Sequence, residues 1–353
     1  MPISISTYEN VSASALLEAM ISAFIEPVIA ISDHQEVIGF NAAARALFPS
    51  LEVAGALALA VRDPIILDAT ALVVANREKQ ERLYSRRVPQ EQFYDVIFSP
   101  LATGGALIIW RDLSTAKALE RMRVDFVAHA SHELRTPLTA IIGFIDTLEG
   151  SARDDAPMRQ TFLKIMREQA NRMRRLINDL LSLSSIEAKV HVVPQAHIDL
   201  ITTVREALEA LQILAQSENV ALHFSALSDC YMVYGDRDEL IRVAENLIEN
   251  AIKYGGSGGQ VSITLENALH HGRREIHLVV QDYGIGISHE HIARLTERFY
   301  RVDETKSRAK GGTGLGLSIV KHIISRHQGR LEIASQLGQG TTFRACLPQV
   351  SGD

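Results

Sequence analysis

Apolar residues recur at helical spacing in two neighbouring segments near the middle of the chain. In the first segment they fall at steps of three and four, which gathers them on one stripe of a helix: Val127, Ala130, Leu134, Ile141 and Leu148. In the second segment the same spacing links Leu163, Met166, Ala170, Met173, Ile177, Leu180 and Ser184. Two helices bury only one stripe each, so the pattern predicts that a second copy of the chain completes a dimeric four-helix bundle.

The limits of these two helices can also be predicted. A charged, periodic segment at 112–123 runs without a break into the first helix, which indicates one long signalling helix. Residues 150–157 combine glycine, serine, aspartate and proline, and they predict the turn that joins the two helices.

Residues 10–112 alternate short strands with short helices. Apolar runs between turn residues predict a small-residue helix at 42–48 and strands at 27–33, 34–41, 93–101 and 105–111. This order resembles a PAS domain, which implies a sensor domain. No cysteine occurs here to bind a flavin, and the one histidine, His34, lies in an expected turn where it is poorly placed to ligate haem. The segment therefore favours a packed dimerisation and signal-relay domain without a cofactor.

From residue 197 onward the pattern becomes a mixture of helices and strands. It predicts helices at 201–217, 237–253 and 315–327, and strands at 220–224, 260–265 and 275–281. The whole chain is thus expected to be a multidomain α+β protein. Its domains are expected at 10–112, 113–190 and 197–350.

Composition narrows the functional classes. The chain has 353 residues and a formal net charge of -6, so it lacks the positive charge suited to direct nucleic acid binding. Only Cys230 and Cys346 occur, without metal-ligand spacing, which fits a reducing compartment. No window reaches the roughly 20 apolar residues of a membrane span, and no secretory signal begins the chain. A cytoplasmic protein without a membrane span is expected, although removal of a membrane anchor stays open.

His132 is the main candidate for chemistry on the first long helix. It lies two residues from both Ala130 and Leu134 of the apolar stripe, so it is expected to point into solvent. Glu133 adjoins it and Thr136 follows one turn later. Pro137 interrupts the helical hydrogen bonds, and because a bend costs about 3 kcal/mol, a purely structural helix would be expected to avoid it.

The run from Ser131 to Leu138 resembles the phospho-acceptor box of sensor histidine kinases. This resemblance implies that His132 accepts a phosphoryl group and that Glu133 orients the imidazole or takes its proton. It also implies that Thr136 holds a water in a phosphatase reaction. His129 departs from the family pattern, where a shorter polar residue is common.

Four clusters in the last part of the chain suit a nucleotide. Asn246, Asn250 and Lys253 share one helix face through spacings of four and three, and they can coordinate hydrated Mg²⁺ and touch phosphate. Asp282 ends an apolar strand, where its carboxylate can accept hydrogen bonds from an amino group. The glycines that follow it, Gly284 and Gly286, allow the backbone to approach a flat base.

The other two clusters suit the phosphates. Gly312, Gly314 and Gly316 open a helix whose first backbone N–H groups favour anions. Arg301 and the basic segment 306–310 are expected to form a lid over the nucleotide.

Together, and in this order, the clusters resemble the ATP-binding domain shared by histidine kinases, Hsp90, gyrase and the mismatch-repair ATPases. The resemblance implies that Asn250 holds Mg²⁺, Lys253 meets phosphate, Tyr254 packs on the nucleotide and Asp282 recognises the adenine amino group. Hydrolysing members have a glutamate that activates water where this chain has Asn246, which cannot act as that base.

The sequence therefore predicts a protein histidine kinase that uses ATP and Mg²⁺. It is expected to phosphorylate His132, to pass the phosphoryl group to an aspartate of a response regulator, and to act as a phosphatase of that regulator. Residues 144–150 and 180–187 most resemble phosphate-regulon sensor kinases. The alternatives are a conformational ATPase of the Hsp90 or gyrase type and a PAS-dependent scaffold with an inactive kinase. The signal, the cognate regulator, and transfer within or between subunits stay open.

Overall fold

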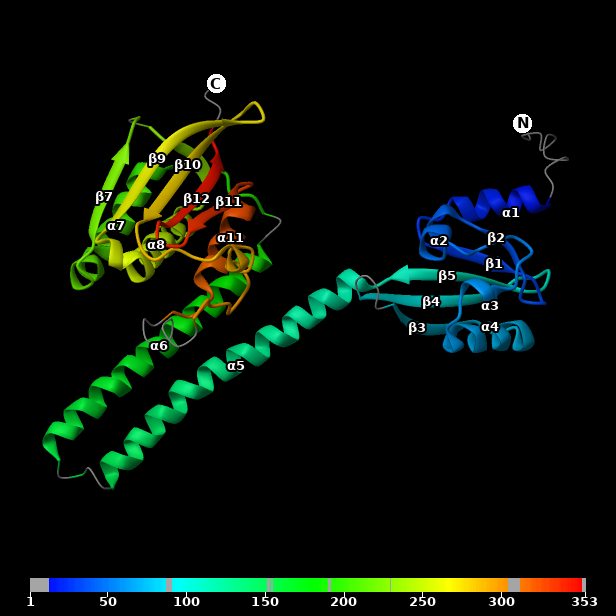
Figure 1. Cartoon of the computed structure of the whole chain (residues 1–353), viewed down its shortest axis with the longest axis horizontal. Coiled ribbons are helices and arrows are strands. Elements are labelled where there is room, and N and C mark those ends of the chain that lie inside the picture. Colours follow the sequence, from blue (N-terminus) through cyan, green and yellow to red (C-terminus); the bar gives the residue numbers. More distant parts are fainter. Residues whose placement is uncertain are drawn as a thin grey trace, which may run out of the picture. The chain divides into compact units, whose positions relative to one another are not determined.

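The chain is described by a computed structural model that covers residues 13–350 except 87–90, 151–152, 154, 190–191, 229 and 304–311. It divides into two compact units, Met1–Val127 and Ala128–Asp353 (Figure 1). Among the residues covered, no helix is both long enough and apolar enough to cross a membrane.

An antiparallel five-stranded sheet forms the centre of the first unit, in the order β2-β1-β5-β4-β3. Its strands are β1 (Val28–Ile31), β2 (Val37–Phe40), β3 (Gln80–Arg86), β4 (Gln92–Pro100) and β5 (Ala106–Asp112). The helices are α1 (Ala13–Ser22), α2 (Ala42–Leu47), α3 (Leu57–Ala60) and α4 (Pro64–Asn76). Alternate residues of β1 enter two cores, since Ile29 packs with α2, α3 and α4 whereas Val28 packs with α1.

The four predicted strands and the helix at 42–48 are confirmed, but α1, α3, α4 and β3 were not predicted. Helix α4 is apolar almost all round, so it shows no clear stripe at helical spacing. Its start could have been recognised. The Asp63 side chain accepts the N–H of Ile65 at 2.9 Å, and Pro64 occupies the first turn, where its missing N–H costs nothing.

Two long helices form the hairpin. Helix α5 (Ser114–Glu149) continues through Pro137, and α6 (Ala156–Ala188) returns beside it (Figure 1). The rings of Phe144 and Phe162 lie 5.0 Å apart between the two helices. The single long helix expected from residue 112 onward is therefore confirmed.

The predicted apolar stripes are not buried within one chain. Val127 is 57% exposed on α5, and Leu163 and Ile177 are 50% and 42% exposed on α6. The remaining stripe residues of α5 are half-buried. On α6 the buried residues are instead Leu176, Leu183 and Ile186, because this helix also packs against α11. Burial of these stripes by a second copy of the chain therefore stays a prediction, and the exposed apolar positions are available for it.

The rest of the second unit is a sheet covered by helices on one face. The sheet has the order β11-β12-β10-β9-β7, with β7 parallel to β9 and the other pairs antiparallel. Its strands are β7 (Ala221–Ala226), β9 (Gln260–His270), β10 (Arg273–Asp282), β11 (Arg330–Gln336) and β12 (Gly340–Pro348). The covering helices are α7 (Leu200–Ser217), α8 (Arg237–Gly255) and α11 (Gly316–Arg326). Strands β6 (Ala196–Asp199) and β8 (Met232–Gly235) form a separate pair.

Side chains along β10 point alternately to the two faces of the sheet, and this alternation determines the direction of Asp282. Ile276, Leu278 and Val280 are buried on the sheet face that packs against the helices. Asp282 continues this period of two, so the carboxylate at the end of the strand also faces the helices, beside α8. The predicted helices at 201–217, 237–253 and 315–327 are confirmed, as are the strands at 220–224, 260–265 and 275–281.

Burial of His327 should make the stability of this domain depend on pH. Its Nε2 accepts the N–H of Asp236 at 3.0 Å, and burial lowers the pKa of the imidazole below its ordinary 6.5. The unfolded chain therefore binds this proton more tightly, so the free energy of unfolding should fall as pH drops below about 6.5. In urea unfolding between about pH 5 and 8, His327→Gln should flatten this dependence. An unchanged slope would contradict the assignment.

Candidate nucleotide and phospho-acceptor site

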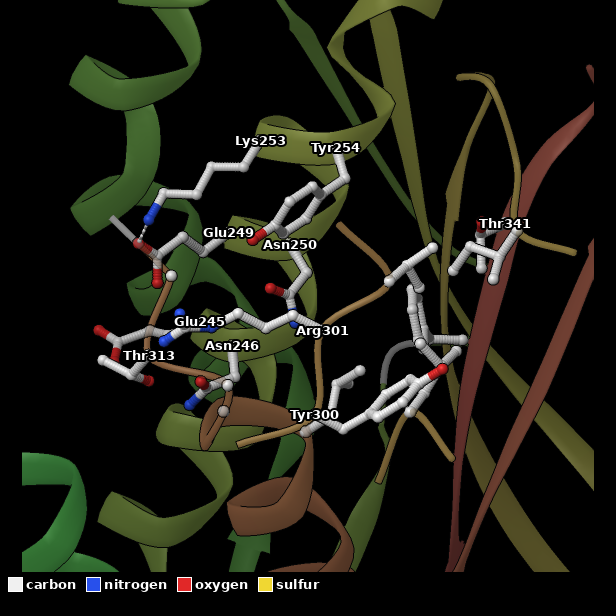
Figure 2. A pocket seen from close by; sticks show the side chains of 18 of the residues that line it. Glu245, Asn246, Glu249, Asn250, Lys253, Tyr254, Tyr300, Arg301, Thr313 and Thr341 are labelled. Carbon is white, nitrogen blue, oxygen red and sulfur yellow. Dashed lines mark ion pairs between the residues drawn. The ribbon is translucent and has the colours of Figure 1, made fainter. Parts of the chain in front are cut away.

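One pocket in the second unit collects most of the predicted nucleotide-binding residues (Figure 2). It encloses about 890 Å³, a size typical of small-molecule sites. The predicted residues that line it are Asn246, Asn250, Lys253, Tyr254, Asp282, Gly286, Arg301, Gly312, Gly314 and Gly316. Gly284 lies behind this wall, where an added Cβ would come within 2.6 Å of the Cα of Gly255.

Asp282 is buried and is held by backbone donors. Its Oδ1 accepts the N–H groups of Gly284 at 3.0 Å and Thr341 at 3.2 Å. Burial raises the pKa of this carboxyl, and the two N–H donors oppose the increase. Gly255 makes room for the side chain, since a Cβ at that position would lie 2.2 Å from the Cβ of Asp282. Both described bonds use Oδ1, which leaves Oδ2 able to accept a hydrogen bond from a ligand.

Helix α8 presents a polar face to the pocket (Figure 2). Asn246, Asn250 and Lys253 lie on it as their spacing predicted. The Nζ of Lys253 is paired with Glu249 at 2.6 Å, so a phosphate would have to compete with this carboxylate. Glu245 also lines the pocket, and burial raises the pKa of its carboxyl. The amide and carboxylate oxygens on this face form a donor set that fits Mg²⁺, a cation that prefers oxygen ligands.

Residues 312–316, called the glycine segment below, approach α8 closely at the start of α11. A Cβ on Gly316 would lie 2.5 Å from the Oδ1 of Asn246, so no larger residue fits without a shift. Gly314 has φ of +75° and its carbonyl accepts the N–H of Phe299 at 2.8 Å. The hydroxyl of Thr313 accepts the N–H of Leu315 at 3.3 Å. Backbone N–H groups at this helix start therefore border the pocket, where they suit phosphate.

The candidate acceptor lies on the neighbouring hairpin. His132 is exposed, as predicted, and the hydroxyl of Thr136 donates to the carbonyl of His132 at 3.2 Å. Glu133 is largely buried, and its Oε2 accepts from Arg172 at 2.9 Å and from Arg301 at 3.0 Å. Arg301 is 4% exposed and belongs to the pocket wall. The residue next to His132 thus contacts the nucleotide pocket directly.

Sequence reasoning missed the part of the wall that α6 supplies. Arg175, Asn178 and Asp179 of this helix line the pocket, and Glu187 of the same helix pairs with Arg298. No local pattern indicates this contact, because it depends on how the hairpin packs against the sheet domain. On α8, by contrast, Glu245 and Glu249 could have been found from their spacing to Asn246 and Asn250. The predicted lid segment 306–310 lies outside the described residues.

Two protein families match this part of the chain. Residues 122–189 match the His Kinase A (phospho-acceptor) domain. Residues 235–351 match the family described as histidine kinase-, DNA gyrase B-, and HSP90-like ATPase. The fold and the pocket therefore define a phospho-acceptor hairpin followed by an ATP-binding domain. These matches bear out the resemblance to sensor histidine kinases that the motifs predicted.

The chain is also similar to individual sensor proteins and to a solved histidine kinase structure. The chain is 42% identical over 240 residues to the phosphate regulon sensor protein PhoR of Pseudomonas aeruginosa, a match that covers 67% of this chain and 52% of the relative. It is 36% identical over 243 residues to the sensor-like histidine kinase SenX3 of Mycobacterium tuberculosis, over 69% of this chain and 58% of the relative. The histidine kinase AdeS of Acinetobacter baumannii is 25% identical with a TM-score of 0.48, over 62% of this chain and 98% of that chain. The chain thus spans about half the length of the curated relatives it matches.

Proposed function

We propose that this chain is an ATP-dependent protein histidine kinase that phosphorylates His132 and then transfers the phosphoryl group to an aspartate of a response regulator. The contact between Glu133 and Arg301 supports the proposal most directly. It joins the residue beside the acceptor to the wall of a pocket whose motifs fit ATP. In-line transfer requires the acceptor nitrogen and the γ-phosphate to lie close together, so the acceptor helix must contact the ATP pocket.

Each side of the pocket has a proposed role in holding ATP. Asp282 accepts a hydrogen bond from the adenine amino group through Oδ2, and Tyr254 packs on the nucleotide. Gly284 and Gly286 keep the backbone close to the base. Lys253 and Arg301 meet the phosphates.

The phosphate end also accounts for the proposed metal and loop residues. Asn250 would hold Mg²⁺, with Asn246 beside it, and when bound the ion supplies charge neutralisation for the phosphates. Gly312, Gly314 and Gly316 allow the backbone at the start of α11 to donate to phosphate oxygens.

At the acceptor, the imidazole of His132 must present a neutral nitrogen to the phosphoryl group. Glu133 orients the ring or takes its proton. Its present partners, Arg172 and Arg301, keep the carboxylate beside the turn of helix α5 that carries His132, called the acceptor turn below. Thr136 would hold a water for a separate reaction, the hydrolytic dephosphorylation of the regulator. For this its hydroxyl would have to leave the carbonyl of His132.

The same proposal includes the wider organisation of the chain. A homodimer is supported by the exposed apolar positions of the hairpin, such as Val127 and Leu163. The domains are proposed at 10–112, 113–190 and 197–350, the first of them a PAS-like sensor domain. Its antiparallel sheet with helices inserted between β2 and β3 supports that assignment.

Incubation of the purified chain with γ-labelled ATP and Mg²⁺ tests the proposed reaction. A protein-bound label that is lost in acid and stable in base is expected for phosphohistidine. Steady release of labelled phosphate without any label on the protein would instead identify a conformational ATPase. Binding of ATP with neither result would indicate an inactive scaffold.

Replacement of Asp282 by asparagine should remove adenine recognition while preserving the fold. The remaining carbonyl oxygen can still accept from Gly284 and Thr341, but the new NH₂ group would face the adenine amino group as a second donor. We expect ATP binding, measured by calorimetry, to weaken by about 1 to 3 kcal/mol. Inosine triphosphate, which lacks the amino group, should bind the original chain less tightly than ATP, and Asp282→Asn should lose this preference. An unchanged preference for ATP would contradict the assigned role.

A further inference from the structure

Helix α6 contacts both the acceptor turn and the nucleotide pocket. Arg172 donates to Glu133 at 2.9 Å, beside the acceptor histidine. Asp179 lies seven residues later, close to two full helical turns, so the two side chains share one face of the helix. Arg175 and Asn178, which lie between them, also line the pocket. One helix face thus connects the acceptor turn to the pocket.

The carboxylate of Asp179 joins two separate elements of the pocket wall. Its Oδ2 accepts the hydroxyl of Thr313 at 2.8 Å, in the glycine segment. Its Oδ1 accepts from the guanidinium of Arg242 at 2.8 Å, on α8. Arg242 also donates to the hydroxyl of Ser182, one turn further along α6. The side chain of Asp179 is 21% exposed, so these charge-assisted bonds are only partly screened by solvent.

Both partners of Asp179 form hydrogen bonds with residues at the part of the pocket that is proposed to hold the phosphates. The hydroxyl of Thr313 accepts the N–H of Leu315 as well, immediately before the first residue of α11. The carbonyl of Arg242 accepts from the side chain of Asn246 at 2.8 Å. Movement of Asp179 would therefore remove its bond to the glycine segment and weaken the attachment of α8, where Arg242 would keep its bond to Ser182.

We propose that Asp179 is a positioning residue that holds the nucleotide pocket against the hairpin for phosphoryl transfer to His132. The inference rests on the proposed kinase function and adds a residue that the motifs do not contain. Asp179 acts through Thr313 and Arg242 rather than on the reacting atoms. Its loss should lower the rate of transfer, which depends on the mutual placement of two domains, more than the affinity for ATP.

The first test compares Asp179→Asn, which keeps the shape and removes the charge, with two changes at its partner. Thr313→Val removes the hydroxyl, and Thr313→Ser keeps it. Asp179→Asn and Thr313→Val should each slow labelling of the chain by γ-labelled ATP by roughly tenfold to hundredfold. Their dissociation constants for ATP, from calorimetry, should stay within about twofold of the original, and Thr313→Ser should restore most of the rate.

The double variant shows whether the two residues act together. If Asp179 works through Thr313, the combined change should slow labelling no more than the larger single effect. Glu168→Gln serves as the matched control, because Glu168 is an exposed carboxylate on the same helix. It should label at the original rate.

The outcomes separate this inference from the proposed function. Labelling of Asp179→Asn at the original rate, additive losses in the double variant, or faster labelling with tighter ATP binding would each overturn the positioning role. The last result would identify the carboxylate as a competitor of phosphate. A complete lack of label on His132 in the original chain would overturn the proposed function as well.

Discussion

His132→Ala should abolish the acid-labile label on this chain and leave ATP binding nearly unchanged. The imidazole is exposed on α5 and does not line the nucleotide pocket, so its removal takes away only the acceptor atom. A nucleophile that forms a covalent intermediate cannot be replaced by a methyl group, and the loss should be complete within detection. The measurements are gel labelling with γ-labelled ATP and calorimetry with ATP on the same preparation.

His129→Ala is the control for this experiment. His129 precedes the acceptor by almost one helical turn, and its ring lies 5.6 Å from that of Phe299. Its replacement removes an imidazole from the same helix and should retain the label. Label that persists on His132→Ala, or that is lost from both variants alike, would contradict the choice of acceptor.

The local parts of the fold could be predicted because they depend on short-range patterns. The period of two along β10 places Asp282 on the helix side of the sheet, and the spacing along α8 brings Asn246, Asn250 and Lys253 into one pocket. Exposure of His132 followed from its position opposite the apolar stripe. Each of these results needs only the geometry of a single element.

The remaining features depend on contacts between elements, which no single helix or strand encodes. The pairs that Asp179 forms with Arg242 and Thr313 span more than sixty residues of sequence. Burial of Leu176 and Leu183 reflects packing of α6 near α11, whereas spacing alone had favoured Ile177 and Leu180. The contact of Glu133 with Arg301 could not be predicted for the same reason.

Glu133→Gln should reduce autophosphorylation strongly, by about 10²- to 10⁴-fold if the carboxylate acts as the base. Glutamine keeps the length of the side chain and can still accept from Arg172 and Arg301, so the fold should be preserved. What it loses is the negative charge that can orient or deprotonate the imidazole of His132. Initial rates of labelling at saturating ATP measure this loss, and a rate close to that of the original chain would exclude the proposed role.

Thr136→Ala should have the opposite profile. Its hydroxyl bonds only the carbonyl of His132 among the contacts described, at 3.2 Å, and it does not line the nucleotide pocket. Autophosphorylation should therefore continue, while dephosphorylation of an isolated phosphorylated regulator should fall by roughly 10²-fold or more because the water is no longer held. Thr136→Ser, which retains the hydroxyl, should keep both rates. Equal losses of both activities in Thr136→Ala and Glu133→Gln would mean that these side chains only maintain the helix.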